Sequence, residues 1–166
     1  MSEIIVPGYL PGAIGRMVEL HATYYHLNGG FGLFFETKVA TEMSEFLSRF
    51  DESRDGFWTL CFNHRVEGGI AMDGIKATTD GAHLRWFILS PETCGRGFGN
   101  RLMEEAISFC KKRSYRKVYL WTFEGLHAAR HLYEKFGFKL LEQTEGSQWG
   151  KKLIEQKFEL TLWALF

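Results

Sequence analysis

Residues 84–110 decide the fold, and they read LRWFILSPETCGRGFGNRLMEEAISFC. The apolar run at 84–89 predicts a strand, and apolar residues at helical spacing over 102–110 predict a helix. Glycines at 95, 97 and 99 stand between them. Glycine allows positive φ and leaves the backbone uncovered, so successive N–H groups and the start of the helix can converge on an anion. The stretch therefore predicts a strand, a phosphate-sized loop and a helix, although a lone glycine-rich turn fits a plain strand-to-helix connection equally well.

Length and composition predict one domain spanning residues 1–166, since 166 residues suffice for a single full core. Twenty basic and twenty acidic residues give a formal net charge of zero, so no global field gathers nucleic acid or anionic lipid. Cys61, Cys94 and Cys110 are widely spaced, which predicts reduced thiols and no metal site. No apolar run reaches membrane-spanning length. We expect a soluble cytoplasmic protein with neither a nucleic-acid nor a membrane partner.

Apolar periodicity places the other elements. Apolar positions over 14–25 repeat at helical spacing and stop at a run of Asn and two Gly at 28–30. After an aromatic connection at 31–35, a second helical stripe runs over 39–50. The remaining expected elements are strands at 4–6, 57–62, 66–72, 82–89, 116–123, 138–143 and 154–163, and a helix at 126–136.

This order, together with two motifs, resembles the GCN5-related N-acetyltransferase (GNAT) superfamily. Residues 89–99 are similar to its acetyl-CoA pyrophosphate loop, Gln/Arg-x-x-Gly-x-Gly/Ala, and residues 129–138, ARHLYEKFGF, to its tyrosine helix with the trailing Gly-Phe. Within the superfamily the chain looks like the acetyltransferase module of MarR–acetyltransferase fusion proteins. The resemblance implies an α+β fold, in which helices flank a mixed, mostly antiparallel sheet in α/β/α layers with one splayed parallel strand pair.

The resemblance also implies that acetyl-CoA is the co-substrate and that no metal is needed. The strand end at 87–89 would offer backbone groups to pantetheine, and the loop at 94–99 would hold the pyrophosphate. Two positions depart from the family pattern: Cys94 replaces Gln or Arg, and Leu126 replaces an Asn that contacts CoA. The implied cofactor-binding residues are Phe87, Ile88, Leu89, Cys94, Gly95, Arg96, Gly97, Phe98, Gly99, Leu126 and Ala129.

Two residues are candidates for the proton transfers. Tyr133 matches the family's acid position, where a phenol can protonate or stabilise the leaving thiolate, while its spacing alone also fits a core tyrosine. His83 stands where histone-type members carry a glutamate, and an imidazole suits proton removal near neutrality. A plain strand-end histidine is the alternative. Strand alternation predicts that His83, Arg85, Phe87 and Leu89 share one face.

Arg85 lies inside an apolar strand and therefore needs an anionic or carbonyl partner. That partner is either a substrate carboxylate or an internal carboxylate, with Glu36 or Glu124 as candidates. By the resemblance, the first two helices and the last hairpin roof the acceptor site. The candidate roof residues are His21, Tyr24, Tyr25, Phe34, Glu36 and Trp149. Their aromatic character favours a small or amino-acid-like amine, and equally fits packing or a homodimer surface.

Two functions follow from these features. The first is an acetyl-CoA-dependent N-acetyltransferase that acts by direct attack of a primary amine of a small molecule, amino acid or peptide. The alternative is a non-catalytic acyl-CoA-binding or regulatory protein of the same fold. A nucleotide-binding loop is disfavoured, because no Lys-Ser/Thr pair follows the glycines and the upstream elements do not form βαβ units.

Overall fold

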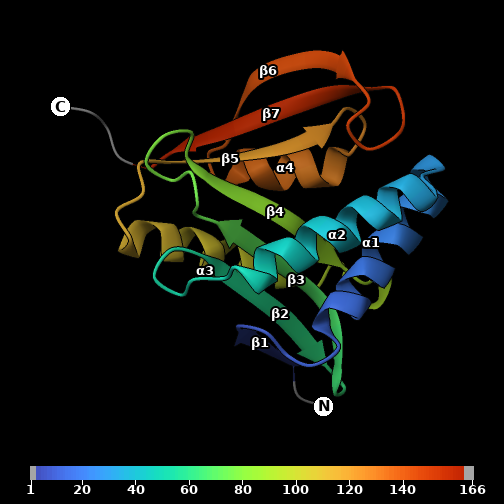
Figure 1. Ribbon diagram of the computed structural model, residues 1–166, viewed down its shortest axis with the longest axis horizontal. Coiled ribbons are helices and arrows are strands. Elements are labelled where there is room, and N and C mark those ends of the chain that lie inside the picture. The colour runs from blue at the N-terminus through green and yellow to red at the C-terminus, as the bar shows by residue number, and fades with distance from the viewer. Residues whose placement is uncertain (1–2, 163–166) are drawn as a thin grey trace.

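The computed structural model describes residues 3–162 (Figure 1). Its elements are β1 (Glu3–Pro7), α1 (Ala13–Gly29), α2 (Leu33–Ser48), β2 (Gly56–Phe62), β3 (Arg65–Asp73), β4 (Ala82–Leu89), the short helix η1 (Pro91–Thr93), α3 (Phe98–Lys112), β5 (Lys117–Phe123), α4 (His127–Lys135), β6 (Lys139–Gly146) and β7 (Leu153–Thr161). Their order is the predicted one. Most boundaries lie within two residues of the expected ones. Two differ by more: α2 begins inside the expected aromatic connection at 31–35, and β6 continues three residues beyond its expected end at 143. Trp163, the expected end of the last strand, lies outside the described residues.

The seven strands form one sheet in the order β1-β2-β3-β4-β5-β7-β6. Every pairing is antiparallel except that of β4 with β5, so the predicted mixed, mostly antiparallel sheet is confirmed. Figure 1 shows α1 and α2 across the near face of the sheet, and α3 and α4 behind it. No helix in the described part of the chain is long and apolar enough to cross a membrane.

Each face of the sheet has its own hydrophobic core, because each helix presents one apolar stripe to the strands. The stripe of α3 is buried against β2, β3 and β4. It consists of Phe98, Leu102, Met103, Ala106, Ile107 and Cys110. On the other face, α2 buries a stripe of the same spacing, made of Phe35, Val39, Met43 and Phe46. The two cores give the α/β/α layers that were expected.

The parallel pair splays, as predicted. Only Ala82 with Val118 and His83 with Tyr119 are in register between β4 and β5. On its other edge, β4 stays paired with β3 as far as Leu89. The β4 backbone groups that face β5 beyond His83 therefore have no partner in the sheet, and they are available to a ligand.

A β-bulge in β4 corrects one expectation. Gly69 pairs with Ile88 and Ala71 pairs with Arg85, so Trp86 and Phe87 together stand opposite one residue of β3. Trp86 has a φ of 49°, which is rare for a bulky residue. A bulge shifts the alternation of side chains by one position.

The consequence is that the strand does not present one continuous polar face. Arg85 reaches α2 on the near face, where it meets Glu42, whereas Phe87 and Leu89 pack against the core beneath α3. The prediction that His83, Arg85, Phe87 and Leu89 share one face is therefore wrong. Period-two alternation could not reveal the extra residue.

Candidate active site

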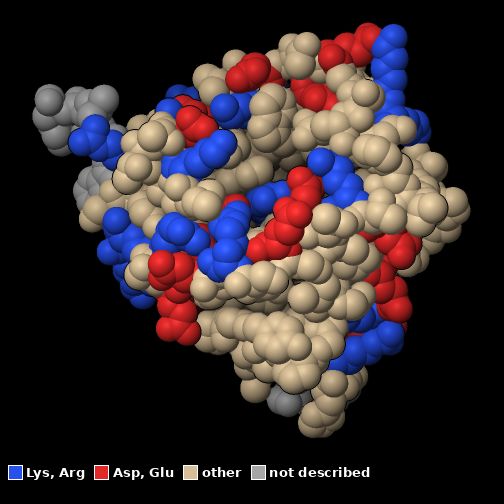
Figure 2. Space-filling view, in the orientation of Figure 1, with Lys and Arg blue, Asp and Glu red and all other residues tan. Residues whose placement is uncertain are grey.

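A cavity of about 190 Å³ opens where β4 and β5 diverge. It is lined from six segments: His21 and Tyr25 of α1; Phe35, Lys38, Val39 and Glu42 of α2; residues 83–87 of β4; residues 120–123 of β5; Tyr133 of α4; and Gln148 and Trp149 of the β6–β7 loop. Figure 2 shows this face hollowed at its centre, with basic and acidic side chains next to each other at the edge of the hollow. The cavity therefore has aromatic walls and one charged side.

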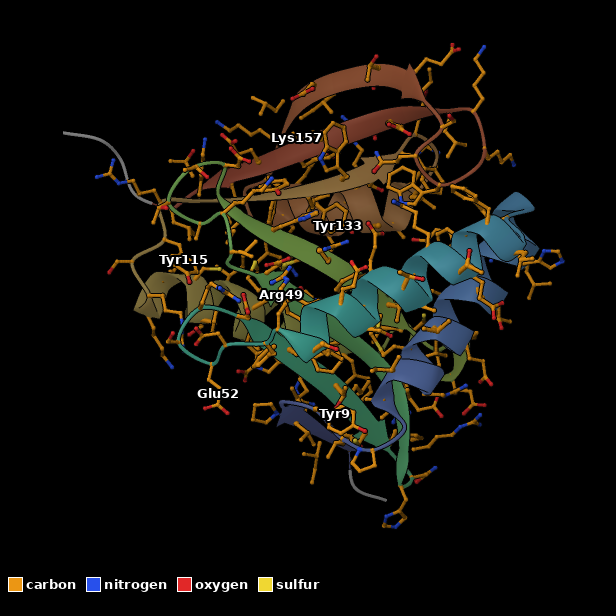
Figure 3. The ribbon with its side chains drawn as sticks, in the orientation of Figure 1. Tyr9, Arg49, Glu52, Tyr115, Tyr133 and Lys157 are labelled. Atoms are coloured by element: carbon orange, nitrogen blue, oxygen red, sulfur yellow. The ribbon has the colours of Figure 1, made fainter. Side chains whose placement is uncertain are left out.

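Tyr133 lies at the inner wall of the cavity and is almost fully buried (Figure 3). Its ring packs against the rings of Phe87, Phe138 and Phe158, with centroids 6.0–6.5 Å away. Burial raises the pKa of the Tyr133 phenol above its usual value, so the hydroxyl stays protonated at neutral pH. A protonated phenol beside the open edge of β4 can donate a proton or a hydrogen bond into the cavity.

Tyr25 and His21 come from successive turns of α1, and both line the cavity. Burial, and then the nearby Tyr133, raises the pKa of Tyr25. His21 is buried, and its Nδ1 lies 2.7 Å from the Met17 carbonyl oxygen. Burial lowers the pKa of His21 to about 4, although the bond to Met17 opposes this shift. His21 is therefore neutral at physiological pH.

His83 is positioned by an aromatic contact. Its ring stacks on Tyr119 of β5 with a centroid distance of 4.4 Å. Burial, and then the positive charge of Arg85, lowers the pKa of His83 to about 3. The imidazole is thus a neutral group that binds a proton only weakly.

Arg85 pairs with internal carboxylates, which was one of its two expected kinds of partner, but these carboxylates are not the expected ones. Its guanidinium lies 3.5 Å from Glu42 and 3.6 Å from Asp73, and 4.1 Å from the ring centroid of Trp86. Asp73 is held in turn by Arg49 at 2.6 Å. The expected partners were Glu36 and Glu124, and both are exposed. Which turn of α2 faces β4 depends on packing, and spacing alone did not show it.

The expected roof residues divide into two groups. His21, Tyr25 and Trp149 line the cavity, and Trp149 packs on Phe123 with a centroid distance of 5.6 Å. Tyr24, Phe34 and Glu36 lie on the outer surface, with Phe34 59% exposed.

Sequence reasoning missed Phe35, Lys38, Val39 and Glu42 of α2 as cavity residues. Their spacing of three and four residues was the available signal, since positions so spaced lie on one helical face.

The glycine loop has the shape of an anion site. Gly95 and Gly97 have φ values of 74° and 85°, and the space where a Cβ would stand is open at both. Gly97 caps α3 without a side-chain hydrogen bond, and the first helical bond runs from the Arg101 N–H to the Gly97 carbonyl. The N–H groups of residues 98–100 precede that first bond, so they face the loop as free donors.

The side chains around the loop add little polarity. Cys94 Sγ donates to the Ser90 carbonyl at 3.4 Å, so the thiol turns back across η1 and away from the glycines. Arg96 is exposed and lies 4.9 Å from the ring centroid of Phe62. At the start of α4, Leu126 provides no side-chain cap, and Ala129 packs against the core. Recognition of an anion here therefore depends on backbone donors and on Arg96.

Metal ligands are not gathered anywhere in residues 3–162, where no group of three or more His, Cys, Asp or Glu side chains is placed to hold an ion.

The splayed strand pair, the glycine loop at the end of β4 and the buried tyrosine together form the arrangement expected of an acyl-CoA-dependent acyltransferase. Residues 17–138 match the family model described as the acetyltransferase (GNAT) family, and the chain belongs to this family. An uncharacterized N-acetyltransferase of Methanocaldococcus jannaschii is 29% identical over 129 residues, which are 74% of this chain and 56% of that protein. The chain thus spans little more than half of that relative.

Solved structures confirm the fold. An acetyltransferase from Streptococcus agalactiae superposes with a TM-score of 0.75 at 19% identity, covering 96% of this chain and 98% of that one. YncA of Salmonella typhimurium, a putative acetyltransferase solved with its cofactor acetyl-CoA, gives a TM-score of 0.75 at 14% identity, covering 98% and 95%. Acetyl-CoA is the acyl donor of this family, and the glycine loop and the open edge of β4 fit its phosphate and amide groups.

Proposed function

We propose that the protein transfers an acetyl group from acetyl-CoA to a primary amine of a small molecule, amino acid or peptide by direct attack. One observation carries this proposal: the cavity lies between the open edge of β4 and Tyr133, and the glycine loop adjoins the end of the same strand. The geometry provides a backbone site for the donor, a proton donor beside it and an enclosed place for the amine.

Acetyl-CoA would be held mainly by backbone groups, and it supplies the activated acetyl thioester. Residues 95–99 and the start of α3 face the pyrophosphate in this proposal, and residues 87–89 face pantetheine. Leu126 and Ala129 flank the same path with apolar contacts. Cys94 turns its thiol to Ser90, so the loop relies on its N–H groups where family members add a polar side chain.

Tyr133 gives its proton to the leaving sulfur in the proposed mechanism. Its raised pKa keeps the proton on the hydroxyl until negative charge develops on the sulfur. The amine must be neutral to attack, and the aromatic walls favour the uncharged form because they exclude water. His83 faces the acceptor as a neutral hydrogen-bonding group, and its low pKa makes it a weak proton acceptor.

The acceptor would lie against Tyr25 and Trp149, next to the charged side of the cavity. Arg85 is proposed to orient a carboxylate of the acceptor while Glu42 and Asp73 hold the guanidinium in place. Glu36 is exposed on α2 and does not line the cavity, so the proposal assigns it no contact with the acceptor. A cytoplasmic location, a homodimer and the similarity to the MarR-fusion module stay predictions.

The test is thiol release from acetyl-CoA, measured with a panel of amines, amino acids and short peptides and without any acceptor. Acceptor-dependent release supports the enzyme. Binding of acetyl-CoA without release on any acceptor supports the rival, a non-catalytic acyl-CoA-binding protein, which the apolar Leu126 and the turned-away Cys94 favour. Failure to bind acetyl-CoA contradicts both.

A further inference from the structure

His21 is a buried polar group that the mechanism above leaves unused. It lies on the face of α1 that is turned to the sheet, 4% exposed, and its ring stacks with Tyr25 at a centroid distance of 6.4 Å. It also lines the cavity where β4 and β5 diverge. An imidazole buried beside a reaction cavity is a candidate for contact with the acceptor.

The hydrogen bond to Met17 fixes which nitrogen carries the proton. A backbone carbonyl can only accept, so the Nδ1 atom, 2.7 Å from the Met17 oxygen, must be the N–H donor. Because the ring is neutral, Nε2 then carries a lone pair. The backbone of α1 therefore holds the imidazole in one tautomer.

The Nε2 atom is open to the cavity. It has no hydrogen-bond partner among the described residues. Within the same residues, the Thr59 hydroxyl is the only buried side-chain polar atom that is both sealed from solvent and unpaired. Nε2 is unpaired but not sealed from solvent, and the residue to which it belongs lines the cavity. A lone pair in this position suits an N–H donor of a ligand.

Tyr25 connects this nitrogen with the proton donor of the proposed reaction. Its ring contacts His21 on one side, and its hydroxyl is close enough to Tyr133 for the two to influence each other electrostatically. His21, Tyr25 and Tyr133 thus line one cavity, which also contains the open edge of β4.

We propose that His21 is a catalytic residue that accepts the amine proton through Nε2. This role rests on the proposed acetyltransferase function. As the amine nitrogen forms its bond to the thioester carbonyl carbon, its proton moves to Nε2. The C–S bond breaks with its electron pair going to sulfur, and Tyr133 supplies the proton that sulfur takes up. Water then removes the proton from His21 and returns one to Tyr133, so one proton passes in net from amine to thiol.

His83 is the competing imidazole. Its ring is stacked on Tyr119 beside the guanidinium of Arg85, where a proton taken up would meet a like charge at once. The Met17 carbonyl, which bonds to the ring of His21, and Tyr25, which stacks on it, are both uncharged. A proton on His21 therefore meets no like charge from these two partners, whereas one on His83 meets Arg85.

The decisive variants are His21→Asn and His21→Gln. The Asn amide nitrogen can take the place of Nδ1 and keep the bond to Met17, while the cavity-facing nitrogen is lost. We expect kcat to fall about 100-fold, the contribution of a general base, with the acetyl-CoA Kd unchanged within about twofold. The Gln amide oxygen can reach the Nε2 position, so His21→Gln should retain the acceptor KM while losing kcat, because an amide accepts a hydrogen bond and takes no proton.

A matched control lies on the same helix. His26 bonds its Nδ1 to the Phe31 carbonyl at 2.8 Å, but it is exposed and outside the cavity. His26→Asn should retain wild-type kcat and KM within about twofold. Nitrogen NMR of the wild-type protein gives a readout without turnover: His21 should show the tautomer protonated at Nδ1.

The outcomes separate the two proposals. A wild-type protein that releases no thiol with any amine overturns the proposed function. An active wild type whose His21→Asn variant keeps more than about a third of kcat overturns only the role of His21, as does the tautomer protonated at Nε2. A loss of kcat that follows a lowered melting temperature or weakened acetyl-CoA binding, in both variants, assigns His21 a structural role and also overturns the proposal.

Discussion

The two ends of the ligand-binding region, the glycine loop and the acceptor cavity, are formed by different kinds of groups. At the end of β4, the glycine loop offers backbone N–H groups from one continuous segment, residues 95–100. At the acceptor cavity, side chains arrive from α1, α2, β4, β5, α4 and the β6–β7 loop. The difference teaches that one end is a local property of the chain, whereas the other exists only when the whole sheet and both helical layers are assembled.

Tyr133→Phe should produce the largest effect, and it acts on the cavity alone. Removing the hydroxyl while keeping the ring among Phe87, Phe138 and Phe158 should lower kcat about 100-fold, the loss typical of a general acid. The acetyl-CoA Kd, measured by calorimetry, should stay near the wild-type value. Unchanged turnover would remove Tyr133 from the mechanism.

Gly97→Ala should act on the loop alone. At a φ of 85°, alanine costs about 1–2 kcal/mol, so the loop relaxes and its N–H groups diverge. We expect acetyl-CoA to bind about tenfold more weakly with little change in kcat at saturation. Gly12→Ala is the matched control, since Gly12 caps α1 at a φ of 87° with open space beside it. An equal loss of affinity in both variants would contradict a specific role for Gly97.

The pH dependence of the free energy of unfolding should arise in part from His21 and His83, the two histidines that line the acceptor cavity. The pKa values of His21 and His83 in the folded protein are about 4 and about 3, against an ordinary 6.5. Below pH 6.5 the unfolded chain takes up protons that the folded protein does not. The free energy of unfolding therefore falls as the pH drops towards these values, by up to about 1.4 kcal/mol per pH unit for each histidine.

Urea denaturation at pH 7.5, 6 and 5 measures this slope, and the double variant His21→Gln, His83→Gln should flatten it. Replacement of the exposed His26 by Gln should leave the slope unchanged. Equal wild-type stability at all three values of pH would show that neither histidine is buried in its neutral form.

Thr59→Val should have the smallest effect, and it should change neither the glycine loop nor the acceptor cavity. The Thr59 hydroxyl is buried without a hydrogen-bond partner, and valine has the same shape. Removing an unsatisfied buried hydroxyl should stabilise the fold by about 1 kcal/mol, measured by urea denaturation. Acetyl-CoA affinity and turnover should stay at the wild-type level. Destabilisation would show that the hydroxyl has a partner, such as a buried water.

The same contrast explains what could be predicted from the sequence. The order of helices and strands and the glycine loop follow from local signals, which are apolar periodicity and glycine positions. The splayed pair was expected only from the family resemblance that the loop and the motif around Tyr133 carry. The Glu42 and Asp73 partners of Arg85 did not follow. They depend on which face of α2 meets β4 and on a bulge that leaves no mark in the pattern of apolar residues.

The acceptor cavity shows the same limit. His21, Tyr25 and Trp149 were expected there, and they line it, whereas Tyr24, Phe34 and Glu36 lie outside. Neighbouring positions on a helix differ by about 100° in direction, so an error of one residue turns a side chain from the cavity to solvent. Choosing between such neighbours requires the packing angle of α1 and α2 on the sheet.

The bulge at Trp86 also sets how far β4 can vary in length. Because of the extra residue, the strand serves both layers: Arg85 belongs to the acceptor side, and Phe87 and Leu89 to the side of α3. Deleting Trp86 would remove the bulge and make Arg85 and Phe87 neighbours, so regular alternation would keep both on the faces that they occupy now. Deleting a regularly paired residue such as Ile88 would instead turn the residues on one side of the deletion to the opposite face. The loop at 74–81 has no such alternation to preserve, so insertions there should be tolerated.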